Sequence, residues 1–375
     1  MEPNEFFWIS LQMRVVGDLC NFACSYCPYG LETTSKQMTD EVLQETTRKV
    51  LEHNMGSSVF CWHGGEPILA GIKFFEQAMG YQAKWGKANE IVNQIQTNGS
   101  LLTHEFACFF KENRFSVGIS LDGPEFIHNA IRVNKGGLGT YKNVVQGFET
   151  LRNAGLEPSV IATVGQHSLA YPREILRHLA VDLGVKSIHF SVVFSAFPKQ
   201  ELAINNESWY AFLRDIFHEW YEIGDPDIEI RELTEVIAWL SGKANPCCTS
   251  LGTCPHWFVI DANGNIYPCE VLERKRHYGN ILIHDFNDVL NTPQHRELIQ
   301  IQSYKPKRCL DCEFLDVCNN GCTNMRIANG KVNPLGHYAY CEQRLALFKD
   351  IKATFESALE SNPEGGDEYE KETLC

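Results

Sequence analysis

Short apolar runs alternate with helix-like stretches through the first half of the chain. The helix-like stretches carry start signals, such as Thr39 before the run from Val42 and Thr103 before the run from Phe106. This alternation is typical of β/α units that build a parallel sheet or barrel. Six strands are predicted, over residues 9–16, 58–62, 91–96, 116–121, 159–164 and 187–193.

The strand pattern stops near Pro198, and a predicted helix over residues 207–223 leads to a cysteine-rich segment. We therefore expect an α/β fold: a partial (β/α)6 TIM-like barrel with its linking helix over residues 1–235, and a small cysteine-rich domain over residues 236–360. The acidic, Gly-containing tail over residues 361–375 is predicted to be disordered. In such barrels the residues directly after each strand form the active site.

Composition excludes several classes of function. The chain has 375 residues, of which 44% are hydrophobic and 21% charged, as in a soluble globular enzyme. A formal charge of -14 argues against nucleic acid and anionic membranes as partners. There is no stretch typical of a spanning helix and no secretion signal at the N-terminus, so we expect a cytoplasmic protein.

Fifteen cysteines without an export signal indicate metal or iron-sulfur ligation, because reducing compartments keep thiols open. Twelve of them form two groups, one of three between Cys20 and Cys27 and one between Cys247 and Cys341. Cys61 and Cys108 lie on apolar elements and are expected to be buried small residues.

The first group, Cys20, Cys24 and Cys27, follows the first predicted strand with the spacing Cys-x3-Cys-x2-Cys. Three thiolates can hold three irons of a [4Fe-4S] cluster and leave the fourth iron open to an exchangeable ligand. A zinc site is the alternative, although zinc would require a fourth protein ligand nearby.

The segment CNFACSYC, with Tyr26 before its last cysteine, resembles the signature of the radical S-adenosylmethionine (SAM) superfamily. The resemblance implies that SAM binds the open iron and that an electron, from a flavodoxin- or ferredoxin-like reductant, breaks its carbon-sulfur bond. The resulting 5'-deoxyadenosyl radical abstracts a substrate hydrogen. Further SAM contacts implied by the same resemblance come from the aromatic residues beside the cysteines and from motifs after strands two to four: Tyr26, Tyr29, Gly64, Gly65, Glu66, Asn98 and Ser120.

Arg132 is expected to clamp the methionine carboxylate of SAM, since a guanidinium matches a carboxylate in two-pronged fashion. The alternative is an ordinary surface arginine.

The C-terminal cysteine group resembles the SPASM domain of radical SAM peptide maturases, with its spacings Cys-x2-Cys-x5-Cys-x3-Cys. The resemblance implies two auxiliary [4Fe-4S] clusters, and hence three in all. We call their ligands the first auxiliary set (Cys248, Cys254, Cys269 and Cys322) and the second auxiliary set (Cys309, Cys312, Cys318 and Cys341). Two four-cysteine zinc sites are the alternative. Cys247 is a spare thiol or exchanges roles with Cys248.

In size and layout the chain resembles the anaerobic sulfatase-maturating enzymes, with two departures. Those enzymes carry Asp where this chain has Glu270, and Gln where it has His63. Both positions are expected to face the substrate, and Glu270 is predicted to be the general base that removes a substrate proton.

The leading hypothesis is a maturase that crosslinks or oxidises a side chain of a ribosomally made peptide. Oxidation of Ser or Cys to formylglycine in a sulfatase is the alternative, and a non-catalytic iron-sulfur electron carrier is an alternative of another class. No leader-binding domain is expected before the barrel, because Cys20 lies so near the N-terminus, and a monomer is favoured.

Overall fold

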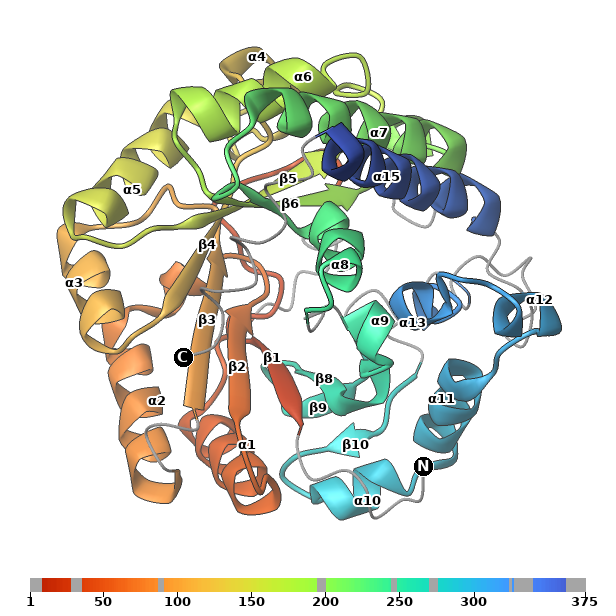
Figure 1. Ribbon diagram of the computed structural model, residues 1–375. Helices are drawn as coiled ribbons and strands as arrows, with labels where there is room; N and C mark the ends of the chain where they lie inside the picture. Colours follow the sequence, from red (N-terminus) through yellow and green to blue (C-terminus); the bar gives the residue numbers. More distant parts are fainter. Residues whose placement is uncertain are drawn as a thin grey trace, which may run out of the picture.

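The computed structural model describes residues 9–27, 36–86, 91–193, 200–243, 248–269, 276–323, 326 and 340–361. Within these residues ten strands form one sheet in the order β10-β9-β8-β1-β2-β3-β4-β5-β6-β7 (Figure 1). The strands are β1 (Ser10–Arg14), β2 (Ser58–His63), β3 (Ile91–Thr97), β4 (Ser116–Ser120), β5 (Ser159–Val164), β6 (Ser187–Val192), β7 (Glu229–Ile230), β8 (Trp257–Ile260), β9 (Asn265–Tyr267) and β10 (Gly279–Asn280).

The helices fall into an outer layer around the sheet and a C-terminal group. Figure 1 shows α1 to α7 along the outside of the curved sheet. The outer helices are α1 (Asp40–His53), α2 (Ile72–Trp85), α3 (His104–Glu112), α4 (Glu125–Ile131), α5 (Tyr141–Asn153), α6 (Pro172–Arg177) and α7 (Asn206–Ile223). The others are α8 (Arg231–Leu240), α9 (Cys248–Leu251), α10 (Phe286–Leu290), α11 (Pro293–Ser303), α12 (Lys307–Leu310), α13 (Leu315–Cys318) and α15 (Cys341–Ser361).

All six predicted strands are confirmed, and neighbouring strands from β1 to β7 pair in parallel. The predicted helix starts are also correct: the side chain of Thr39 accepts from Val42 N and that of Thr103 from Phe106 N. A partial, open barrel results, because β7 and β10 are the two edges of the sheet. Of the tail predicted to be disordered, residue Ser361 ends helix α15 and residues 362–375 lie outside the described residues.

The two faces of the barrel sheet differ in chemistry. Met13 and Trp62 lie in register on the outer face and are fully buried, Trp62 against aromatic rings of α2. On the inner face Gln12, Cys61 and Gln94 lie in register on β1, β2 and β3. Cys61 is half-buried, as is Cys108 on α3, so the prediction that these two cysteines are buried is wrong. A polar, partly exposed inner face leaves the barrel interior suited to a polar ligand rather than to a packed apolar core.

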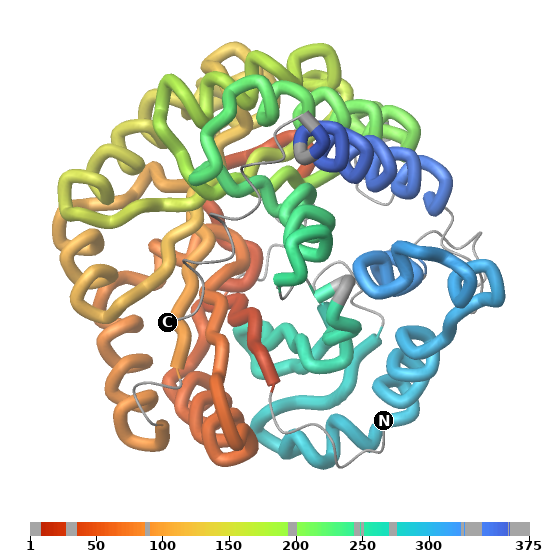
Figure 2. The backbone as a smooth tube through the Cα atoms, viewed as in Figure 1, coloured from red at the N-terminus to blue at the C-terminus, as the bar shows by residue number. Residues whose placement is uncertain are grey.

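The C-terminal segment continues the barrel sheet instead of forming a separate one. Strand β8 pairs in parallel with β1, and β9 and β10 follow in antiparallel order. Helix α15 returns along α7 and α8 (Figure 2). Arg344 of α15 forms a 2.6 Å ion pair with Glu235 of α8, and both side chains are largely buried. The proposed division between residues 235 and 236 falls inside α8, and one continuous sheet includes strands from both sides of it.

Candidate active site

The three cysteines of the loop after β1, here called the loop cysteines (Cys20, Cys24 and Cys27), lie close enough to interact electrostatically. Backbone bonds fasten their loop to the end of α4: Ala23 N donates to Val133 O and Ser25 N to Ile131 O, each at 2.8 Å. The loop is thus held across two segments that are more than a hundred residues apart in sequence.

Two N–H donors point at the sulfur of Cys20. The backbone N of Phe22 lies 3.4 Å from this sulfur, and the amide Nδ2 of Asn98 lies 3.8 Å from it. Burial raises the pKa of Cys20 above its ordinary value, although these two donors oppose the shift. The contact with the amide places Asn98, a predicted SAM contact, beside the predicted cluster.

Gly64 and Gly65 form a tight turn after β2 with φ values of 82° and 49°. A Cβ atom at Gly65 would overlap the carbonyl oxygen of Leu19, which accepts a 2.8 Å hydrogen bond from Glu66 N. Only glycine fits this close approach. The turn thereby brings its backbone against the residue that precedes Cys20.

The carboxylate of Glu66 is fully buried and organises the end of β3. It accepts hydrogen bonds from Ile68 N (3.1 Å), Thr97 Oγ1 (2.7 Å) and Asn98 N (2.7 Å). Burial raises the pKa of Glu66 to about 7, although these donors oppose the shift. The side chain is engaged within the protein, so any SAM contact of this motif is expected to come from the backbone of Gly64 and Gly65.

Arg132 is buried, so the alternative of an ordinary surface arginine is wrong. Its Nε and Nη2 donate to the two carboxylate oxygens of Asp122 at 2.7 and 2.9 Å, and Nη2 also donates to Thr163 Oγ1 at 3.1 Å. The guanidinium lies 5.3 Å from the ring centre of Tyr26. Burial alone would raise the pKa of Asp122, but the attraction and hydrogen bonds of Arg132 outweigh it and lower that pKa.

Asp122 was not predicted as a site residue, although it lies two residues after the predicted contact Ser120 in the motif Ser-x-Asp-Gly. A conspicuous acidic residue after a strand was the available signal. Ser120 itself is half-buried at the end of β4 and accepts from Gln96 Nε2 at 3.1 Å. Arg132 and Asp122 together tie the ends of β4 and β5 to the segment that fastens the cysteine loop.

His63 lies at the end of β2, directly before the glycine turn. The backbone N of Gly64 donates to His63 Nδ1 at 2.6 Å, which leaves the ring proton on Nε2. Burial, with a smaller effect from Arg14, lowers the pKa of His63 to about 4. His63 is therefore a neutral N–H donor at pH 7.

In the C-terminal segment the four members of the second auxiliary set lie close to one another. Cys309 is near enough to interact electrostatically with each of the other three. Two members of the first auxiliary set, Cys254 and Cys322, approach the guanidinium of Arg326. Among the described residues no three His, Cys, Asp or Glu side chains are arranged to hold a metal ion. Three residues of the predicted sites, Tyr29, Cys247 and Glu270, lie outside the described residues.

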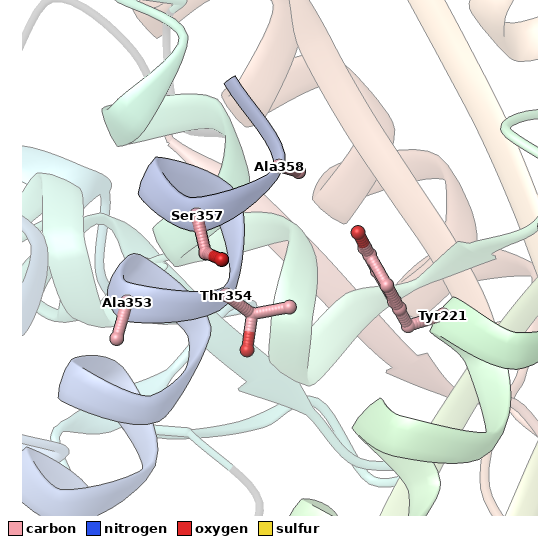
Figure 3. Close-up of a pocket in the computed structure, with 5 residues that line it drawn as sticks. All are labelled: Tyr221, Ala353, Thr354, Ser357 and Ala358. Carbon is pink, nitrogen blue, oxygen red and sulfur yellow. The ribbon is translucent and has the colours of Figure 1, made fainter. Parts of the chain in front are cut away.

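An open pocket between α7 and α15 is lined by Tyr221, Ala353, Thr354, Ser357 and Ala358 (Figure 3). It carries no acid, base or thiol of the kind that catalysis uses, apart from the phenol of Tyr221. The strand ends around the loop cysteines thus remain the candidate active site.

No helix in the described ranges is long and apolar enough to span a membrane.

The fold and this site define a radical SAM enzyme with a C-terminal cluster-binding domain. The chain matches the Radical SAM superfamily over residues 15–179 and the iron-sulfur cluster-binding SPASM domain over residues 254–313. It therefore uses SAM and iron-sulfur clusters and is an oxidoreductase that modifies a protein or peptide.

Relatives define the family more narrowly. The chain is 31% identical to a cysteine-type anaerobic sulfatase-maturating enzyme of Clostridium perfringens, over 91% of this chain and 95% of that protein. It is 29% identical to a serine-type enzyme of Bacteroides thetaiotaomicron, over 91% and 90%. The solved structure of native anSMEcpe with bound AdoMet matches with a TM-score of 0.82 and 27% identity, over 94% and 99%. The chain belongs to the family of anaerobic sulfatase-maturating enzymes.

Streptococcus suis SuiB bound to its precursor peptide SuiA matches with a TM-score of 0.66 at 15% identity, over 90% of this chain and 76% of that one. This likeness shows the shared fold alone.

Proposed function

We propose that the protein is an anaerobic sulfatase-maturating enzyme that oxidises a Ser or Cys side chain of a sulfatase to formylglycine. The observation that carries the proposal is the 31% identity that extends over 95% of the Clostridium perfringens enzyme. From the sequence alone, crosslinking of a short ribosomally made peptide is the leading hypothesis. The relatives favour its alternative, the sulfatase substrate, since cysteine-type and serine-type enzymes of that kind both align over nearly their full lengths.

In this proposal the loop cysteines hold the cluster that binds SAM, and bound SAM supplies the radical that takes a hydrogen atom from the substrate. The backbone of Gly64 and Gly65 and the side chains of Asn98 and Ser120 position SAM. Asn98 supports this role because its amide bridges the sulfur of Cys20 and the side chain of Asn21, 2.8 Å away. The two auxiliary sets hold the clusters that take up the electron which the substrate loses.

Glu270 is proposed as the general base that takes the substrate proton after the hydrogen atom has left. It directly follows Cys269, a member of the first auxiliary set, in the sequence. Glu270→Gln keeps the shape and removes the basicity. We expect it to cleave SAM at a normal rate and to form product at least roughly a hundredfold more slowly. Product formation near the rate of the unaltered enzyme would assign the proton to another acceptor.

The substrate is tested with sulfatase peptides that carry Cys or Ser at the modified position. The reduced enzyme is incubated with SAM, and the aldehyde is trapped with a hydrazine and located by mass spectrometry. Formation of formylglycine in either peptide supports the proposal, and the ratio of the two rates defines the type. The proposal would be overturned if neither peptide formed an aldehyde and if 5'-deoxyadenosine were released equally with and without the peptides. That result would favour the crosslinking maturase.

His63 offers a matched variant for the same assay. The neutral ring donates a hydrogen bond through Nε2. A Gln side chain, which sulfatase-maturating enzymes are expected to carry at this position, can donate a hydrogen bond through its amide. His63→Gln is therefore expected to retain formylglycine formation, whereas His63→Leu removes the donor and should raise the KM for the peptide. An unchanged KM in His63→Leu would remove this residue from the substrate site.

A further inference from the structure

Arg326 is a fully buried cation in the cysteine-rich segment, with 0% of its surface exposed. Its backbone N donates to Cys322 O at 3.1 Å, and its Nη2 donates to Ile301 O at 2.6 Å. The other two guanidinium nitrogens, Nε and Nη1, are buried as well. Within the described part of the chain they have no hydrogen-bond partner.

The neighbours of the guanidinium come from both auxiliary sets. Its strongest electrostatic interactions are with four cysteines: Cys254 and Cys322 of the first set, and Cys309 and Cys318 of the second. No carboxylate within the described ranges forms an ion pair with Arg326. The side chain therefore lies near thiols of both auxiliary sets.

A second cation adds to the positive charge at this place. Lys305 lies near Arg326, Cys309 and Cys318, and its Nζ donates to Gln302 O at 2.7 Å. Two cations close together in the protein interior repel each other, and each loses hydration. An arginine stays charged in proteins, so its burial costs several kcal/mol unless negative charge compensates it.

The chemistry of the surroundings identifies what supplies that charge. Thiolates that ligate iron-sulfur clusters are anionic, and their sulfur atoms accept hydrogen bonds from N–H donors. Two clusters would provide acceptors for the buried Nε and Nη1 and would balance the charge. The buried, unsatisfied guanidinium therefore fits a pair of clusters better than it fits a pair of protonated thiol groups.

We propose that Arg326 is a positioning residue shared by the two auxiliary clusters, which donates hydrogen bonds to their sulfur atoms and stabilises their reduced state. Reduction adds one electron, and hence one negative charge, to a cluster. A fixed cation beside the cluster makes that addition more favourable and raises the reduction potential, as hydrogen bonds to the sulfurs do. The proposal does not depend on which side chain the enzyme oxidises.

The test uses the full chain with alanine at the three loop cysteines, so that only auxiliary clusters remain. Anaerobically reconstituted protein is titrated with dithionite, and the midpoint potentials are followed by electron paramagnetic resonance. Arg326→Met removes the charge and the donors at similar volume, Arg326→Lys retains the charge, and Arg296→Met removes a charge from the exposed face of α11 as a matched control.

In Arg326→Met we expect the reduction equilibrium of at least one auxiliary cluster to fall at least tenfold, a potential about 59 mV more negative for a one-electron couple. Arg326→Lys should shift it less, and Arg296→Met should leave it unchanged. Iron loss in Arg326→Met that Arg326→Lys restores would also support the charge-balancing role.

Two results would overturn the proposal. Arg326→Met could retain all of its iron and titrate like Arg296→Met. Alternatively, Arg326→Met and Arg326→Lys could both lose the iron of both clusters, which would make the residue structural.

Discussion

Replacement of Arg132 with Met tests whether this arginine supports the barrel or binds SAM. In the folded chain the Asp122 carboxylate has a side-chain exposure of 0%, and Arg132 supplies two of its hydrogen bonds. Arg132→Met would leave that carboxylate buried with Thr163 N as its remaining close donor, 2.7 Å away. Removal of one member of a buried pair costs about 3–5 kcal/mol, because an uncompensated charge remains.

The double variant Asp122→Leu with Arg132→Met separates this cost from the value of the pair itself. A buried pair replaced by apolar residues of similar volume is often neutral in stability. We therefore expect the double variant to recover most of the loss that Arg132→Met suffers. The assay is urea unfolding of the anaerobically purified chain, followed by circular dichroism. A double variant as unstable as the single variant would refute the reasoning from buried charge.

The same double variant reports on SAM. If Arg132 clamps the methionine carboxylate, the stable double variant should bind SAM more weakly by about 1.5–3 kcal/mol, measured by equilibrium dialysis. If Arg132 acts only through Asp122, the affinity should stay within a factor of about two. The second result would withdraw Arg132 from the SAM site and leave it as the support of the cysteine loop.

Anaerobically reconstituted enzyme should hold about twelve iron and sulfide per chain, and alanine at the three loop cysteines should leave about two thirds of them; zinc in their place would contradict the assignment. Because burial raises the pKa of Glu66 from 4.5 to about 7, the folded chain binds a proton that the unfolded chain releases, and stability should fall by about 3 kcal/mol as pH rises through that window. Urea midpoints at pH 5 and pH 8 measure this fall, which should vanish in Glu66→Gln. Gly65→Ala should weaken SAM binding at least about tenfold, because the added Cβ would overlap the backbone of Leu19. Gly71→Ala should leave SAM binding unchanged, because the added Cβ has open space around it. Equal losses of SAM affinity in the two variants would point to backbone strain alone.

Much of the barrel could be predicted from the sequence, because the signals are local. Alternating apolar runs define β1 to β6, and the caps at Thr39 and Thr103 depend on residues three positions apart. The cysteine spacings likewise indicate cluster chemistry without any knowledge of the fold. The short strands β7 to β10 were not predicted, since two to four residues carry too weak a periodic signal.

The tertiary structure decided which polar groups meet. Arg132 and Asp122 are ten residues apart, and nothing in their local sequence distinguishes a buried pair from a SAM clamp. Arg326 carries no local sequence signal of burial, and only the folded chain places it near cysteines that lie up to 72 positions away. The pairing of β8 with β1, which joins the cysteine-rich segment to the barrel, spans almost 250 residues. Sequence patterns record the preferences of neighbours along the chain, whereas ion pairs and sheet edges depend on contacts that form only when distant segments pack together.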